Sequence, residues 1–150
     1  MCSSDLFPSH DKNQNEAIEN PCIYVSQNGI NWDVQKGFKN PLDDIQNVAI
    51  EYNSDPHLVY NNINNEIECY WRWVGRDTHP TKPNAEIIYR RTSKDGINWS
   101  DKELSFEWDN TENSTRAVIS PSIIFEDGIY KMWASHSLDA AGNIRPIGYW

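Results

Sequence analysis

The sequence predicts an all-β fold made of β-propeller blades, each with four antiparallel strands, and three observations lead to this prediction. Short β-rich segments alternate with Asn, Asp and Gly, while helical periodicity is scarce. One seven-residue turn occurs twice, as SQNGINW at residues 26–32 and as SKDGINW at residues 93–99. The segments around the turn repeat as well, which is the mark of a repeat architecture.

The repeat defines the strands of one blade. SDPHLVY at 54–60 aligns with ISPSIIF at 119–125, and IECYWRW at 67–73 aligns with IYKMWAS at 129–135. The first three strands are therefore predicted to contain HLVY, ECYWRW and EIIYRRT, and the fourth strand follows the KDGINW turn. Four such strands with a Trp-bearing hairpin are typical of a propeller blade.

The repeated turn has a structural explanation, because every blade needs the same hairpin between its third and fourth strands. NG and DG dipeptides tolerate the positive φ of a tight turn, so Gly29 and Gly96 are expected to adopt it. Ser26 and Ser93 are expected to bond back to the turn backbone. The two tryptophans of the turns, Trp32 and Trp99, are expected to pack between blades.

The repeat also predicts how the chain is divided. Residues 1–45 are expected to be the end of one blade, 46–115 a whole blade and 116–150 the start of the next. A propeller closes only with four or more blades, so we expect this partial propeller domain to be a fragment of a longer one. Exposed blade faces would then make the isolated chain self-associate.

Composition limits the function classes. The 150 residues carry a net charge of −9, which disfavours nucleic acid and anionic membrane surfaces as partners. A neutral or cationic ligand fits better, although the acidity would also serve solubility alone. No apolar run reaches transmembrane length, and the first residues do not form a secretory signal, so localisation stays unknown.

No cofactor or metal site is predicted. The three cysteines, Cys2, Cys22 and Cys69, lack metal-type spacing, and Cys22 and Cys69 are expected to be buried free thiols. The four histidines are scattered, and neither a Gly-rich phosphate loop nor a Ser nucleophile elbow occurs.

Three stretches, ENPCIYVSQNGINW, SDPHLVY and SPSIIFEDGIYKMWAS, resemble the five-bladed propellers of the glycoside hydrolase family 43 and 32 type, closest to uncharacterised bacterial and phage members. The repeated turn is also similar to the Asp-box of sialidases. This resemblance implies an axial pocket that binds a sugar or glycan, with acidic residues at its rim.

Asp55 is the first candidate at such a pocket. Blade topology places it at the start of an inner strand, with His57 two positions later on the same face. The resemblance implies a catalytic or pKa-modulating role for Asp55, whereas capping the strand through an Asx-turn is an equal alternative. Ser120 occupies the matching position of the next blade. A glycosidase needs two carboxyl groups, so Ser120 puts hydrolysis in doubt.

The remaining candidates come from the same face. Glu19 lies at the start of a third strand and is a second catalytic candidate, with a rim charge as the alternative. Trp71 and Trp73 share the opposite strand face from Arg72 and are expected to be inter-blade core. The candidate substrate-binding residues in the strand ends and long loops are His57, Arg72, Arg76, Asp77, Ser120 and His136.

Three functions follow from these features. The first is a glycoside hydrolase-like enzyme that uses Asp55 and Glu19. The second is a non-catalytic propeller that binds a carbohydrate or receptor, as in a surface or phage-tail protein, and Ser120 favours it. The third is a scaffold that binds protein through its loops.

Overall fold

The fold is all-β in the part of the chain that the computed structural model describes, which is residues 20–45, 51–75, 85–107, 118–136 and 148–149. No helix occurs in these ranges, as the sequence predicts, and none of them could span a membrane as a helix. The strands are β1 (Glu51–Asn61), β2 (Glu66–Gly75), β3 (Ala85–Ser93), β4 (Glu103–Glu107), β5 (Val118–Glu126), β6 (Ile129–His136) and β7 (Gly148–Tyr149).

The first sheet contains the four strands that the repeat predicts, in the order β1-β2-β3-β4, and all neighbours are antiparallel. Four residues connect β1 to β2, and Asn65 adopts a φ of 54° there, a conformation that Asn tolerates well. Ser93 at the end of β3 pairs with Ile67 near the start of β2. The turn after β3 therefore lies at the same end of the sheet as the β1–β2 turn.

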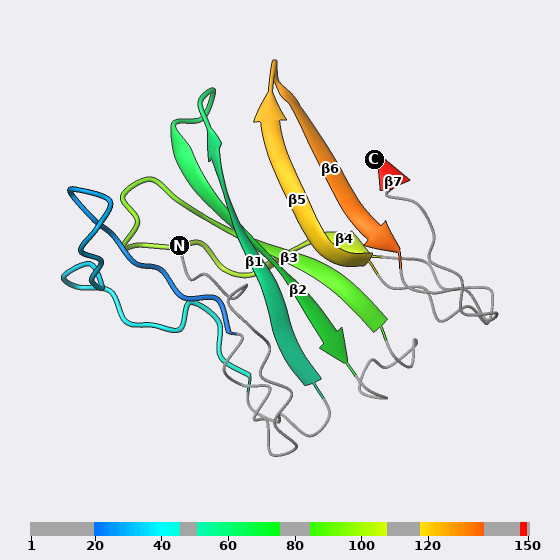
Figure 1. The fold of residues 1–150 in the computed structure, drawn as a ribbon, viewed down its shortest axis with the longest axis horizontal. Coiled ribbons are helices and arrows are strands. Elements are labelled where there is room, and N and C mark those ends of the chain that lie inside the picture. Colours follow the sequence, from blue (N-terminus) through cyan, green and yellow to red (C-terminus); the bar gives the residue numbers. More distant parts are fainter. Residues whose placement is uncertain (1–19, 46–50, 76–84, 108–117, 137–147, 150) are drawn as a thin grey trace.

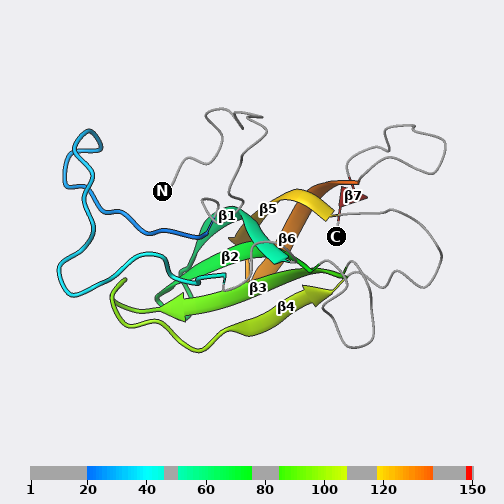
Figure 2. The same ribbon diagram turned by 90° about the horizontal axis from the view of Figure 1, so that it is seen from below.

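The second sheet repeats the first. It has the order β5-β6-β7, and its β5–β6 hairpin points the same way as the β1–β2 hairpin (Figure 1). β1 and β5 are the edge strands of their sheets, and they lie side by side (Figures 1 and 2). Two antiparallel sheets with adjacent inner strands are consistent with partial propeller blades. The number of blades and the division at residues 45 and 115 stay predictions.

One expected alignment is shifted by one residue. Tyr60 and Phe125 hold equivalent positions before the hairpin turns, and Ile67 and Tyr130 hold equivalent positions after them. Equivalent residues of the two sheets are thus 65 positions apart before the hairpin turns and 63 positions apart after them. The difference arises because the β5–β6 turn is two residues shorter than the β1–β2 turn. The sequence alignment used 62, pairing Ile67 with Ile129. Since a slip of one residue moves every side chain to the other face, Trp133 corresponds to Tyr70 and not to Trp71.

The first sheet is packed on both faces. On one face Val59, Tyr70 and Ile88 pack against Ile123 and Ala134 of the second sheet. On the other face Cys69 and Trp71 pack against Ile23 and Leu42 of the segment 20–45, which lies across the sheet from β5 and β6 (Figure 2). The strand β2 is buried along most of its length for this reason.

The tryptophans of β2 are core residues, as predicted. Trp71 is fully buried and Trp73 is 8% exposed, and both lie near Tyr89. A buried aromatic side chain removes about 150–250 Å² from water, which contributes roughly 4–6 kcal/mol before the entropy of ordering is subtracted. These two residues therefore anchor the segment 20–45 to the first sheet.

The segment 20–45 was expected to end a blade with two strands, but it contains no strand. It holds one isolated bridge, between Val25 and Asp33, and a backbone bond from Leu42 N to Pro21 O at 2.7 Å. The side chain of Asn40 takes the place of a strand partner, because it bonds both the N–H and the C=O of Ile23. A side-chain amide thus satisfies the backbone where the sequence predicts a ladder.

Candidate functional site

The two repeated turns have the same internal hydrogen bonds, as the sequence predicts. Gly29 N donates to Ser26 Oγ at 2.9 Å, and Gly96 N donates to Ser93 Oγ at the same distance. Gly29 has a φ of 72° and Gly96 a φ of 73°. The turns are therefore structural elements of the repeat.

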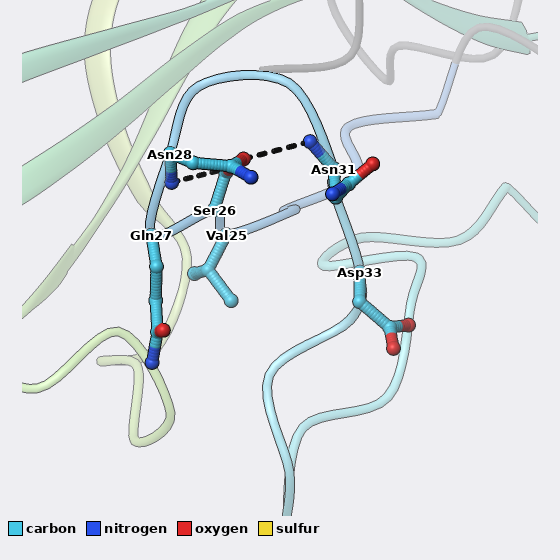
Figure 3. Close-up of a pocket in the computed structure, with 6 residues that line it drawn as sticks. All are labelled: Val25, Ser26, Gln27, Asn28, Asn31 and Asp33. Carbon is cyan, nitrogen blue, oxygen red and sulfur yellow. Dashed lines mark hydrogen bonds between the residues drawn. The ribbon is translucent and has the colours of Figure 1, made fainter.

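The two tryptophans of the turns differ. Trp99 packs against the core cluster formed by Trp71 and its neighbours, as expected for a residue between layers. Trp32 is 51% exposed within the described part of the chain, and its packing between blades stays a prediction. The open hollow at the first turn is lined mainly by polar side chains such as Gln27 and Asn31 (Figure 3). Asn28 accepts hydrogen bonds from the turn backbone there, so its carbonyl oxygen serves the turn.

Asp55 and Ser120 lie at equivalent β-bulges. In β1 the register shifts between Ser54 and His57, and in β5 it shifts between Ile119 and Ser122. Asp55 has a φ of 54° and Ser120 a φ of 50°, and each precedes a proline, which disfavours the right-handed helical region. β1 begins at Glu51, so Asp55 lies inside the strand and not at its start, where the sequence placed it.

The backbone at these bulges is strained. A non-glycine residue at positive φ costs about 1–3 kcal/mol and persists only where its surroundings hold it. The cost falls at the low end for Asp, which tolerates this region better than Ser. Strain of this kind clusters at functional sites. Bulges serve there to aim a side chain in a direction that regular alternation does not reach.

The Asp55 carboxylate joins the two sheets. Its Oδ1 accepts a hydrogen bond from Ser120 Oγ at 3.2 Å, across the β1–β5 boundary. Its Oδ2 accepts one from Ser54 Oγ at 2.9 Å and lies 3.6 Å from Arg72 Nη1. Three residues that the sequence singled out separately, Asp55, Arg72 and Ser120, are thus brought together.

His57 lies beside this group but faces the neighbouring strand. Its Nε2 is 2.7 Å from the Ile123 carbonyl oxygen. Since a carbonyl oxygen only accepts, the ring must donate from Nε2. The bulge places Ser54 opposite Arg72 and His57 opposite Tyr70, on the β2 face toward the second sheet. His57 therefore fixes β1 against β5 next to Asp55.

Four predicted site residues lie wholly or partly outside the part of the chain that the structure describes. Glu19, Arg76 and Asp77 lie outside the described residues. His136 ends β6 opposite Val118, and its side chain lies outside the described part. The catalytic prediction for Glu19 and the binding predictions for Arg76, Asp77 and His136 stay predictions.

Ser54 is the site residue that sequence reasoning missed. It is 4% exposed and bonds both Asp55 and Arg72, whose Nη1 donates to Ser54 Oγ at 3.4 Å. A serine in a strand carries no pattern that would set it apart. Its place opposite Arg72 follows from the pairing of β1 with β2, and the bulge beside it is hinted at only by the following Asp-Pro pair.

A second polar cluster joins the sheets near the hairpin turns, away from Asp55. Glu68 is fully buried, and it accepts hydrogen bonds from Tyr70 Oη at 2.5 Å, Tyr130 Oη at 2.6 Å and Asn61 Nδ2 at 3.1 Å. Arg90 Nη1 lies 3.8 Å from its Oε2. Burial, followed by the hydrogen bond to Glu68, raises the pKa of both Tyr70 and Tyr130. Both oxygens of Glu68 are therefore occupied by protein partners.

Neither of the described cysteines, Cys22 and Cys69, is in a disulfide. Cys69 is buried as expected, whereas Cys22 is only half-buried. Within the described ranges, no group of three or more His, Cys, Asp or Glu side chains is arranged to hold a metal ion.

No protein-family model matches this chain. The chain is 26% identical over 147 residues to the A type blood N-acetyl-α-D-galactosamine deacetylase of Flavonifractor plautii, a match that covers 81% of this chain and 19% of the relative. In structure it is similar to an N-acetylgalactosamine deacetylase from F. plautii, solved in complex with blood group B trisaccharide. The TM-score is 0.69 at 17% identity, over 91% of this chain and 46% of that one.

These matches support the fold and a likeness to a carbohydrate-acting enzyme. The chain spans about a fifth of the curated relative and just under half of the solved chain. Both matches are named as deacetylases, so the comparisons give no support to the specific resemblance to glycoside hydrolase families 43 and 32.

Proposed function

We propose that this chain is part of a carbohydrate-active hydrolase that removes the acetyl group of an N-acetylated sugar, with Asp55 in contact with the substrate. The observation that carries the proposal is the Asp55 carboxylate, held at positive φ in a bulge and partly exposed at the boundary of two inner strands. The deacetylase named among the relatives supports the choice of bond.

Amide hydrolysis suits the site better than glycoside hydrolysis. A glycosidase places two carboxyl groups on either side of the scissile bond. Here the position equivalent to Asp55 is Ser120, so the repeat supplies one carboxylate at this level. Amide hydrolysis needs one base to take a proton from water as the oxygen attacks the acetyl carbon. That proton then goes to the leaving nitrogen as the carbon–nitrogen bond breaks, which yields acetate and an amine.

Asp55 would be this base, and Ser120 would hold the sugar beside it. The Ser120 side chain is on the exposed side of the carboxylate and donates to Asp55 Oδ1. A hydroxyl can donate and accept, so it can exchange this bond for one to a sugar hydroxyl or acetamido group. The net charge of −9 fits a neutral substrate or a cationic product.

The test uses the full-length protein and two glycans, one ending in N-acetylgalactosamine and the other in galactose. Free acetate and free sugar are both measured, so that amide and glycosidic cleavage are separated. Acetate release from the first glycan alone is expected. The Asp55→Asn variant should lower this rate about 10²–10⁴-fold, the usual contribution of a general base.

Asp127→Asn is the matched control. Asp127 has a φ of 52° and lies in the β5–β6 turn, away from Asp55, so the control makes the same change at the same backbone conformation. Its activity should equal that of the unaltered protein. Release of sugar in place of acetate would contradict the deacetylase and favour a glycosidase.

A non-catalytic carbohydrate-binding protein is the second candidate, and Ser120 favours it because a hydroxyl at a bulge suits binding more than acid–base work. Saturable binding of the N-acetylated glycan without any acetate or sugar release would support this candidate and contradict the hydrolase.

A further inference from the structure

We propose that Arg72 and Ser54 position the Asp55 carboxylate from behind and do not contact the substrate. This inference rests on the proposed function. It gives Arg72 a different role from the substrate contact expected from the sequence, and it adds Ser54, which the sequence did not mark.

The two oxygens of the Asp55 carboxylate have different partners. Arg72 Nη1 lies 3.6 Å from Asp55 Oδ2, and Ser54 Oγ donates to the same oxygen at 2.9 Å. Arg72 Nη1 also donates to Ser54 Oγ at 3.4 Å, which closes a triangle on Oδ2. The other oxygen, Oδ1, accepts a hydrogen bond from Ser120 Oγ at 3.2 Å.

Burial divides the same residues in the same way. Ser54 is 4% exposed and Arg72 is 9% exposed. The Asp55 side chain is 22% exposed, and Ser120 is an exposed residue. A sugar approaching the boundary of β1 and β5 can therefore reach Oδ1 and Ser120, while the triangle stays covered by protein.

The backbone explains why Asp55 needs such support. A bulge residue at positive φ has lost the regular ladder that fixes its neighbours, and χ2 of an Asp rotates over a broad range. A reacting group must be held within about 0.5 Å and 10–20° of its working geometry by partners whose own positions are fixed. Arg72 is fixed by burial in β2, opposite Ser54.

A positioning role predicts a particular kinetic effect. A residue that binds the substrate changes KM when it is removed, whereas a residue that orients the base changes kcat. Removing the outer partners that orient the ligands of a metal site typically lowers activity about 10–100-fold, and we expect a loss of the same order for a residue that orients a base. The Arg72→Met variant should therefore lose about 10–100-fold in kcat with KM nearly unchanged, and Ser54→Ala should lose less.

The experiment measures kcat and KM for acetate release by the full-length protein and by four variants: Arg72→Met, Arg72→Lys, Ser54→Ala and Arg90→Met. Arg72→Lys keeps the cation and should recover part of kcat. Arg90→Met is the control, because it removes an arginine whose partners are Glu68 and Glu103. Its kcat should stay unchanged even where its stability falls.

Two results would overturn the inference while leaving the proposed function intact. One is a raised KM with normal kcat in Arg72→Met, which would make Arg72 a substrate contact. The other is full activity in both Arg72→Lys and Ser54→Ala, the variants that keep the fold if Arg72→Met does not. A fully active Asp55→Asn variant would instead reject the proposed function, and it is measured in parallel.

Discussion

Glu68 and Asp55 each connect the two sheets by hydrogen bonds, and these two carboxylates differ in almost every physical respect. Glu68 contacts Tyr130 where no water reaches its carboxylate, and each of its oxygens has at least two partners. Asp55 contacts Ser120 at the outside, on strained backbone, with one oxygen held by the protein and the other turned to an exposed hydroxyl. Saturated, buried carboxylates specify how elements pack. A partly exposed carboxylate on strained backbone leaves capacity for a ligand.

The largest stability effect is expected from Glu68→Ala in the full-length protein. This variant removes the fully buried carboxylate that accepts hydrogen bonds from Tyr70, Tyr130 and Asn61. Breaking a buried charged network by removing one partner costs about 3–5 kcal/mol. The free energy of unfolding from urea titration checks it. A loss of unfolding free energy below 1 kcal/mol in Glu68→Ala would contradict the view that Glu68 serves the fold while Asp55 serves a ligand.

Asp55→Asn should have the opposite profile. We expect about 10²–10⁴-fold lower acetate release. The loss of unfolding free energy should stay near 1 kcal/mol, the net value of one hydrogen bond, because Asn keeps the positive φ and an acceptor oxygen. The same urea titration and the glycan assay check both parts. If the loss of acetate release were explained by an equally large loss of unfolding free energy, Asp55 would serve the fold alone.

The sequence predicts the fold better than it predicts the site, and the reason is physical. Strand existence follows from alternation and turn residues, so β1 to β4 and the Ser93–Trp99 turn were predicted. Register depends on turn length, which differs by two residues between the hairpins, so β6 was aligned one residue out. Partners across sheets, such as Glu68 with Tyr130, depend on packing that no local pattern encodes.

Tyr130→Phe is expected to have an intermediate effect on stability that depends on pH. Burial and Glu68 raise the pKa of Tyr70 and Tyr130, so the folded state holds these protons more tightly than the unfolded state. The contribution of these two protons to the free energy of unfolding is therefore fully present below the pKa of unfolded tyrosine, near 10. It is lost as the pH rises above that value. The variant should lose about 1 kcal/mol at neutral pH and show a shallower loss above pH 10. Urea titrations from pH 7 to 11 check both; an unchanged alkaline slope would contradict the prediction.

The smallest effect is expected at a third carboxylate, Asp95, which is fully exposed in the second repeated turn. Hydrogen bonds from the Asn98 backbone, then from the Asn98 side chain and the Ile97 backbone, lower its pKa. Because the pKa of Asp95 is lower in the folded state, its carboxylate stabilises the folded state above the unfolded pKa, near 4. This contribution is lost as the pH falls through the folded pKa.

Asp95→Asn should therefore flatten part of the acid dependence of stability and change little at neutral pH. The first turn supplies the precedent, because Asn28 already makes the equivalent backbone contacts there without a charge. Asn28→Asp is the matched reverse change and should add acid sensitivity. Unfolding measured between pH 2 and 7 compares the three proteins. If Asp95→Asn destabilised the protein as much as Glu68→Ala, burial would no longer separate structural carboxylates from exposed ones in this fold.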